Sequence, residues 1–215
     1  WSPGRLAAGG RKVNPAGQQF VKRKLKTPFK GMSALDYAAN FNDFLKQVEK
    51  GQPFCFWLGT YEPHRGYDLE NGKRKGRDPA KVIVPPIFPD HPTVRSDLLD
   101  YYMEIEHFDQ MVARAMKLLK ISGQLDNTIV VVTSNHGMPF PRAKASLYDA
   151  GSRVPLAIRW PKGIIAPGRV FDGPVNLSDL APTFLAATGL QVPEMMTARS
   201  LMDVIKNSPT NNHLA

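Results

Sequence analysis

Cysteine is nearly absent from this sequence, because Cys55 is the only one among 215 residues. A lone cysteine excludes an internal disulfide framework and a zinc site built from several cysteines. It lies inside the apolar run Phe54–Leu58, so we expect a buried and unreactive thiol.

Long hydrophobic runs, internal repeats and low-complexity segments are also missing. No apolar run approaches the roughly 20 residues of a membrane-spanning helix, so we expect no membrane span. The sequence starts at Trp1 without an initiator methionine or a signal-peptide pattern, in a stretch rich in glycine and proline. We therefore expect an internal piece of a longer protein, with any targeting segment outside this sequence.

Positive charge is in excess, with 28 lysines and arginines against 19 acidic residues and a net charge of +9 at pH 7. Much of it lies in two early segments, at Arg11, Lys12, Lys22, Arg23, Lys24, Lys26, Lys30, Lys73, Arg74, Lys75 and Arg77. Such segments are either solvated loops or a surface that attracts a polyanion, which could be nucleic acid or a sulfated glycan. Neither zinc-finger spacing nor an aromatic RNA-binding signature is present, so we expect no nucleic-acid partner.

Hydrophobic periodicity divides the chain into an extended start and an α/β remainder. Residues 1–32 are rich in Gly, Pro, Lys and Arg and predict an extended basic segment. Helices are predicted at 33–49 with Ser33 as N-cap, at 93–120, and from Asn176 or Ser178 to about Gly189. Short strands are predicted at 54–58, 129–133 and 156–159, and an irregular region at 66–92.

Strands that alternate with long helices predict a parallel or mixed sheet covered on both faces. Phe54–Leu58 and Ile129–Thr133 are continuously apolar, and a long helix separates them in the sequence. We therefore predict that they are neighbouring or near-neighbouring strands of one sheet and run in the same direction.

Polar side chains follow these two predicted strands. Glu62, His64 and Arg65 come after the first, and Asn135 and His136 come directly after the second. Ligands of open α/β sheets collect outside the carboxyl ends of the strands, so parallel strands would bring both groups to the same edge. The pattern predicts a site that binds an anion, and its oxygen and nitrogen atoms are also compatible with a metal ion.

Each of these residues also has a purely structural explanation. Asn135, His136 and Gly137 are typical of a turn, since Asn and Gly favour left-handed backbone. His64 follows a proline and is compatible with an exposed loop, and Lys144 is compatible with a surface lysine.

Several stretches together resemble the sulfatase family. Residues 126–137 resemble its strand followed by Asp-Asn-Gly or Asp-His-Gly, and residues 144–155 resemble its lysine four residues before a Tyr-Glu/Asp-x-Gly element. Residues 57–65 resemble the segment that carries an active-site histidine, and residues 178–183 resemble a helix near the end of the catalytic domain. Residues 1–19 resemble the Gly/Pro-rich stretch of heparan N-sulfatase-like members.

The resemblance implies a three-layer α/β/α alkaline-phosphatase-like sandwich, incomplete in this chain, with residues 33–215 forming part of the catalytic domain. It implies that Asn135 and His136 are metal ligands and that His64 and Lys144 contact the sulfate group as catalytic and substrate-binding residues. It also implies a calcium or similar divalent ion, a formylglycine nucleophile, a sulfated small molecule or glycan such as a glycosaminoglycan as substrate, and an extracytoplasmic location (periplasmic, secreted or lysosomal).

The sequence departs from the family pattern in two ways. It has no Cys/Ser-x-Pro/Ala-x-Arg motif for conversion to formylglycine, and no paired aspartates that complete the metal site. Both, with the remainder of the same catalytic domain, are expected outside this chain, which we therefore expect to be inactive alone. Asn135 stands where the family usually has aspartate, so metal affinity should fall. A catalytically silent binder of sulfated glycans or other polyanions, and a related phosphodiesterase or phosphonate hydrolase, stay open as alternatives.

Overall fold

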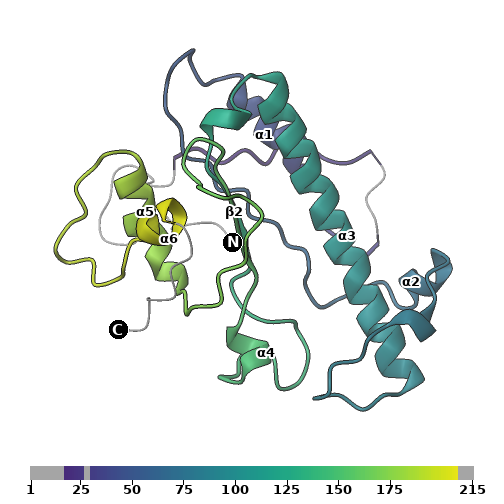
Figure 1. The fold of residues 1–215 in the computed structure, drawn as a ribbon. Coiled ribbons are helices and arrows are strands. Elements are labelled where there is room, and N and C mark those ends of the chain that lie inside the picture. Colours follow the sequence, from purple (N-terminus) through teal and green to yellow (C-terminus); the bar gives the residue numbers. More distant parts are fainter. Residues whose placement is uncertain (1–16, 27–29, 208–215) are drawn as a thin grey trace, which may run out of the picture. The chain divides into compact units, whose positions relative to one another are not determined.

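The computed structural model describes residues 17–26 and 30–207, so the predictions for residues 1–16 lie outside the described part. The chain divides into two compact units. Among the described residues, the first unit contains 17–26, 30–125 and 133–155, and the second contains 126–132 and 156–207. Figure 1 gives the element labels used below.

The first unit is built on one long helix, α3 (Pro92–Ile121), which confirms the helix predicted at 93–120. Pro92 occupies the first turn, where its missing N–H costs nothing, and the His91 ring accepts a hydrogen bond from the Thr93 N–H at 3.3 Å. Two shorter helices, α1 (Tyr37–Leu45) and α2 (Asn71–Arg74), pack on α3 (Figure 1). The remaining helix of this unit is α4 (Asp149–Ser152).

The buried face of α3 supplies most of the core of this unit. Leu98 is fully buried and packs with Leu99, Val82 and Phe140 in one apolar cluster. Met111, further along the helix, packs with residues of α1 in a second cluster. The core therefore fixes α3 against both the loop before it and the segment around residue 140.

Helix α1 begins four residues later than predicted, and Ser33 is not its N-cap. Asp36 takes that position, and its carboxylate accepts a hydrogen bond from the Ala39 N–H at 2.9 Å. The Ser33 N–H is instead bound by the Glu62 carboxylate at 2.6 Å, and the Ser33 hydroxyl accepts from Leu35 N–H at 3.1 Å. These contacts hold Ser33 in a turn outside the helix.

The predicted strand at Phe54–Leu58 is wrong for this chain, and so is its pairing with Ile129–Thr133. The segment alternates between half-buried and exposed residues, and Phe54 and Phe56 pack on Phe44 of α1 at ring-centre distances of 5.5 and 4.7 Å. No backbone hydrogen bond involves residues 53–59 within the described ranges. A strand needs a hydrogen-bonded partner, and the described residues provide none beside this segment.

The prediction of a buried Cys55 is also wrong, because its thiol is exposed. Cys55 lies on the opposite side of the extended segment from Phe54 and Phe56, next to Trp57, which is 72% exposed. Only the side that faces α1 is covered.

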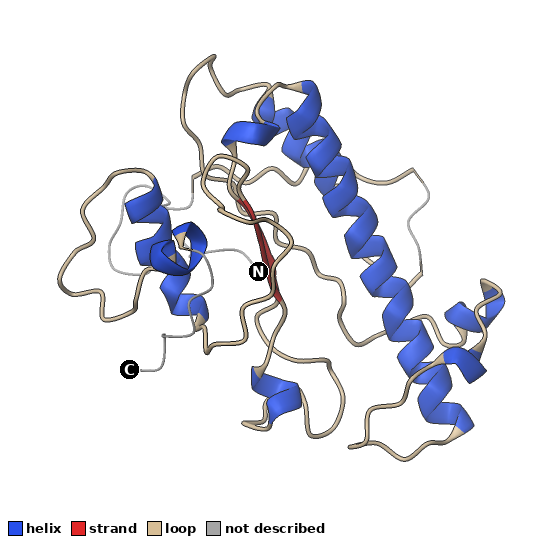
Figure 2. Ribbon diagram, viewed as in Figure 1, coloured by secondary structure: helices blue, strands red, loops and turns tan. Residues whose placement is uncertain are grey.

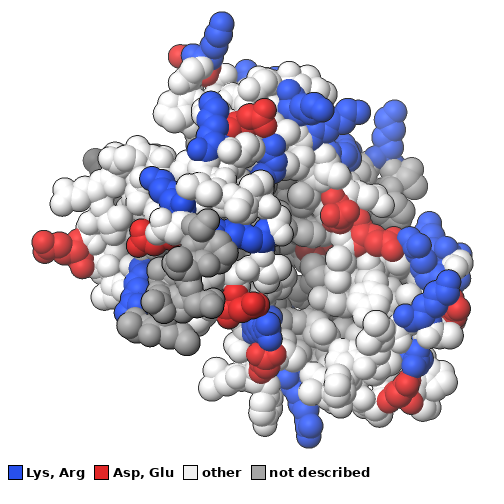
Figure 3. Space-filling model, in the orientation of Figure 1, with Lys and Arg blue, Asp and Glu red and all other residues white. Residues whose placement is uncertain are grey.

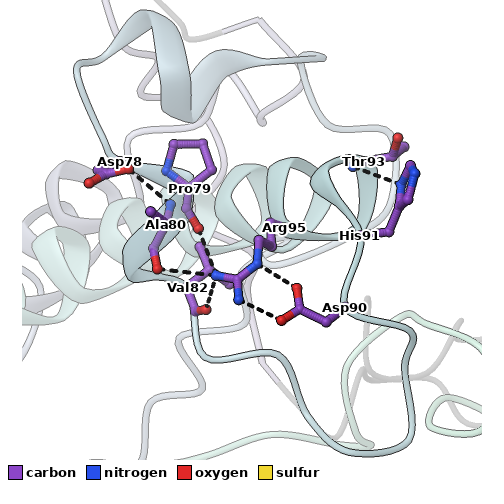
Figure 4. Close-up of polar contacts among 8 residues, drawn as sticks. All are labelled: Asp78, Pro79, Ala80, Val82, Asp90, His91, Thr93 and Arg95. Carbon is purple, nitrogen blue, oxygen red and sulfur yellow. Dashed lines mark hydrogen bonds and ion pairs between the residues drawn. The ribbon is translucent and has the colours of Figure 1, made fainter.

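The region predicted to be irregular, 66–92, contains two short helical turns, α2 and the 3-10 turn η1 (Pro79–Lys81). Arg95 of α3 holds the second of these in place, as Figure 4 shows. Its Nη1 donates to the carbonyls of Pro79, Ala80 and Val82 at 2.8–3.2 Å. Its Nε and Nη2 donate to the Asp90 carboxylate at 2.5 and 2.7 Å.

The second unit contains the sheet and the last helices. Strands β1 (Val130–Thr133) and β2 (Leu156–Arg159) are hydrogen-bonded neighbours and confirm the strands predicted at 129–133 and 156–159. The last predicted helix forms as the 3-10 turn η3 (Leu177–Asp179) followed directly by α5 (Leu180–Ala187). Another 3-10 turn, η2 (Leu125–Asn127), precedes β1, and a short helix, α6 (Met202–Lys206), follows α5. Asn176 and Asp179 form the capping box that starts this helical segment.

Figure 2 shows that these two strands are the only strands in the described part of the chain. No helix among the described residues is long and apolar enough to cross a membrane.

Candidate functional site

The loop that carries His64 is anchored through the buried carboxylate of Glu62. Glu62 is 5% exposed and accepts hydrogen bonds from the Ser33 N–H at 2.6 Å and the Tyr37 hydroxyl at 2.9 Å. The Thr60 hydroxyl donates to the Glu62 carbonyl at 2.7 Å. Glu62 therefore has a structural role, with both carboxylate oxygens occupied by donors from this unit.

The His64 side chain is exposed, but its backbone is hydrogen-bonded to helix α3. Its N–H donates to Oε2 of Glu104 on α3 at 2.7 Å. Its ring Nδ1 lies 2.9 Å from the Arg65 carbonyl, and a carbonyl only accepts, so this contact needs the Nδ1–H tautomer. In that tautomer Nε2 carries the lone pair that is free to interact with a substrate.

Arg65 links the histidine loop to the segment that precedes Lys144. Its guanidinium forms a two-pronged ion pair with Asp97 of α3, with N–O distances of 2.6–2.9 Å. Its Nε donates to the Pro139 carbonyl at 3.3 Å, and its guanidinium lies over the Phe140 ring, 4.6 Å from the centre. Segments 74 residues apart in the sequence are thus joined by one side chain.

Replacing Arg65 with lysine is expected to loosen this link. A lysine keeps the positive charge but lacks the planar guanidinium, which pairs with Asp97, donates to the Pro139 carbonyl and lies over the Phe140 ring at the same time. We expect the free energy of unfolding to fall by about 1 kcal/mol, measured by urea denaturation. The Lys144 N–H, which donates to the Met138 carbonyl at 3.0 Å, should exchange faster with deuterium.

Arg77 provides the matched control, because it forms one hydrogen-bonded ion pair, with Glu106 at 2.7 Å. Arg77→Lys should leave the exchange rate of the Lys144 amide unchanged. Equal effects of the two substitutions on that rate would contradict the linking role of Arg65.

Asn135 and His136 lie in a tight turn directly after β1. The Ser134 hydroxyl donates to the His136 carbonyl at 2.8 Å, and the Gly137 N–H donates to the Gly151 carbonyl at 2.9 Å. A Cβ at Gly137 would lie 1.8 Å from the Ala150 carbonyl oxygen, so only glycine fits here. The chain bends at residues 135–137 without the left-handed backbone that the turn interpretation assumed, and the Asn135 side chain is exposed.

His136 is half-buried, and its Nδ1 lies 2.8 Å from the Gly137 carbonyl. As for His64, this contact needs the Nδ1–H tautomer and leaves Nε2 to act as a ligand. Asn135 offers an amide oxygen of the kind that calcium accepts, whereas an imidazole suits zinc better than calcium. The described residues contain no cluster of three or more His, Cys, Asp or Glu placed to hold a metal.

Lys144 is exposed at the end of a loop that is fixed at several points. Phe140 is 6% exposed and Ala143 is fully buried, so the loop is held against the core on both sides of Arg142. Within the described ranges, Lys144 has no hydrogen bond or ion pair with His64, Asn135 or His136. The structure thus brings the loops of His64 and Lys144 together through Arg65, without showing a direct contact between the two side chains.

A cavity of about 300 Å³ lies beside His64. Its lining comes from two loops and from α3, and consists of Gly31, Met32, Ser33, Tyr61, Glu62, His64, Arg65 and Glu104. Asn135, His136 and Lys144 are not part of it.

Glu104 is the residue near this cavity that the sequence analysis missed. It is 2% exposed, and burial, followed by repulsion from Glu62, raises its pKa to about 7, although the hydrogen bond from the His64 N–H acts in the opposite direction. A sequence signal was present, because Ser96, Asp100, Glu104 and His107 recur at helical spacing on the buried face of α3. Polar residues on a buried face need a structural or functional partner.

The comparison with known proteins defines the class. A family model described as Sulfatase matches residues 11–190. The chain therefore belongs to the sulfatase family, whose members are sulfuric ester hydrolases. Its fold is the alkaline-phosphatase-like α/β fold, present here as part of a domain.

Individual relatives agree with this assignment. Human N-sulphoglucosamine sulphohydrolase is 30% identical over 193 residues, which is 76% of this chain and 38% of that protein. An arylsulfatase of Clostridium perfringens is 32% identical over 196 residues, 76% of this chain and 40% of that protein. A crystal structure of a putative sulfatase, yidJ, from Bacteroides fragilis superposes with a TM-score of 0.71 at 27% identity, covering 83% of this chain and 42% of that one. The chain thus spans less than half the length of these relatives.

Proposed function

We propose that the intact protein hydrolyses sulfate esters or N-sulfate groups, and that this chain supplies part of the metal and sulfate pocket. The observation that carries the proposal is the contact of Arg65 with Pro139 and Phe140. It joins the loops of His64 and Lys144, two residues whose surroundings match the sulfatase pattern, inside a chain that belongs to the family.

His64 and Lys144 have the chemistry that sulfuryl transfer needs. The sulfuryl oxygens carry negative charge during transfer, and a fixed ammonium such as that of Lys144 stabilises this charge without reorganising. The imidazolium form of His64 keeps its Nδ1 proton on the Arg65 carbonyl and can give its Nε2 proton to the leaving oxygen or nitrogen, which is the role we assign to this residue.

Asn135 and His136 are proposed as two ligands of a divalent ion, with calcium as the first candidate. When bound, such an ion polarises the sulfate group as a Lewis acid. Two ligands do not complete a coordination sphere, so the proposal needs further carboxylates from outside this chain, together with the formylglycine.

The substrate class follows from the unpaired positive charge. Near α2, acidic side chains are interspersed with basic ones (Figure 3), and Lys73, Arg74 and Arg77 pair with Glu70, Asp68 and Glu106. By contrast, Lys22, Lys24 and Lys26 are exposed and have no ion pair within residues 17–26 and 30–207. Together with a relative named for N-sulphoglucosamine, this favours a sulfated glycan as substrate. The extracytoplasmic location of the intact protein is proposed from its family membership alone.

One observation favours a second candidate, a catalytically silent binder of sulfated glycans. Asn135 has no negative charge where the family usually has aspartate, which would weaken the binding of a metal ion. The phosphonate hydrolase alternative has weaker support, since the phosphonate monoester hydrolase of Silicibacter pomeroyi is 23% identical and shows only a shared fold.

The test compares this chain with the intact protein on an aryl sulfate. The 215-residue chain should show no turnover, because the covalent nucleophile is not in its sequence. The intact protein should hydrolyse the substrate, and His64→Ala should lower its kcat/KM. Turnover by the 215-residue chain that His64→Ala abolishes would contradict the proposed division of the site, and an inactive intact protein that still binds sulfated glycans would favour the silent binder.

A further inference from the structure

We infer that Glu104 is the positioning residue for His64, holding the backbone of the catalytic loop from helix α3. The inference rests on the proposed function for the role of His64. The hydrogen bond from the His64 N–H to Glu104 Oε2, at 2.7 Å, spans 40 residues of sequence and ties an exposed loop to a rigid helix.

Helix α3 holds the histidine loop at two points. Asp97 binds Arg65, and Glu104 binds His64. The two carboxylates are seven residues apart, which is two helical turns, so they lie on the same face of α3. This geometry fixes two consecutive residues of the loop and therefore limits how far the His64 ring can move.

Glu104 is held in surroundings that do not suit a carboxylate. It is 2% exposed, and its Oε1 is buried without a hydrogen-bond partner within the described residues. The titratable groups near it are Glu62, Tyr61, His64 and Arg65 around the cavity, Tyr67, and the buried Asp100 and His107 one turn away on α3. Glu62 already accepts two hydrogen bonds, so it donates nothing to Glu104 and repels its charge.

The same surroundings make the hold on His64 depend on pH. Burial and Glu62 raise the pKa of Glu104 to about 7, above the value near 4.5 of an ordinary glutamate. The neutral form is therefore favoured in the folded protein, and the stability that it contributes is fully present below about pH 4.5 and is lost as the pH rises through 7. Ionisation makes Oε2 a stronger acceptor for the His64 N–H but leaves an uncompensated charge in the core.

Asparagine-selective labelling of a His64→Asn variant provides a direct test, because this substitution removes the ionisation of the imidazole itself. In the intact protein with ¹⁵N-asparagine, the amide resonance that His64→Asn adds should titrate with a midpoint near pH 7. Glu104→Gln keeps the amide oxygen as acceptor but removes the ionisation, so this titration should disappear. Glu106→Gln is the matched control, because Glu106 lies on the same helix but pairs with exposed Arg77, and it should leave the titration unchanged.

Kinetics separate positioning from a general loss of structure. Glu104→Ala should lower kcat by about tenfold with little change in KM, because substrate still binds while the acid is misplaced. Glu104→Gln should restore most of kcat. A position-64 amide that titrates equally with and without Glu104→Gln in the His64→Asn background, or an unchanged kcat in Glu104→Ala, would overturn the inference. If the intact protein proves catalytically silent, the amide titration alone decides whether Glu104 holds the backbone of residue 64.

Discussion

Replacing Lys144 with alanine in the intact protein is expected to lower kcat/KM for a sulfate ester by about 30- to 900-fold. The range corresponds to about 2–4 kcal/mol, the usual cost of removing one preorganised group that stabilises developing negative charge. The loop is suited to preorganisation. Pro139 and Pro141 restrict its backbone, Phe140 is buried, and the Lys144 N–H is bound to the Met138 carbonyl at 3.0 Å.

Arg142 is the control for this experiment. It carries the same charge two residues earlier, is exposed, and has a left-handed backbone with φ of 61°. Because the family's spacing to tyrosine falls on Lys144 rather than Arg142, Arg142→Ala should change kcat/KM by less than about threefold, within the range of ordinary surface changes. Equal losses in the two variants would show that general positive charge matters and not a placed ammonium.

The long helix and the two observed strands were predictable because their determinants are local. Pro92 at the start of α3, a continuous apolar spacing through Leu119 and Gly123 after its end all lie within about 30 residues. The capping residues of the last helical segment, Asn176 and Asp179, are likewise close together in the sequence. Such signals need no knowledge of the rest of the fold.

The failure at Phe54–Leu58 has a different cause. Its apolar composition predicted a buried strand, whereas the structure has an extended segment that packs on α1 through Phe54 and Phe56 only. Whether an extended segment becomes a strand depends on a neighbouring backbone, and local sequence does not identify that neighbour. Cys55 and Trp57 are exposed for the same reason, because no described element packs on their side of the segment.

The candidate site was predictable as a set of positions but not as a network. Sequence spacing placed His64, Asn135 and His136 after apolar runs, and their roles stay predictions. The supports of the histidine loop, Asp97 and Glu104, come from 32 and 40 residues away and could not be paired with it by spacing. Their hydrogen-bonding partners emerge only from the packing of the loop on α3.

Introducing a carboxylate at position 135 adds a charged group to the proposed pocket, whereas Lys144→Ala removes one. In the intact protein, Asn135→Asp is expected to raise the affinity for a divalent ion by about 100-fold, or about 2.7 kcal/mol. An amide oxygen can ligate calcium but brings no charge, and the number of charged ligands is a main determinant of calcium affinity. The Asn135 side chain is exposed at the tip of a turn that Gly137 and Gly151 hold in place, so the substitution should not disturb the fold.

The measurement is a calorimetric titration of the metal-free intact protein with calcium and, separately, with manganese. Asn127→Asp adds the same charge at the other end of β1, where the Asn127 amide oxygen accepts a hydrogen bond from Lys162 at 3.2 Å, and it should leave both affinities unchanged. A higher affinity for both metals in Asn135→Asp, with no change in Asn127→Asp, would support position 135 as a metal ligand. Unchanged affinity in Asn135→Asp would remove it from the metal site.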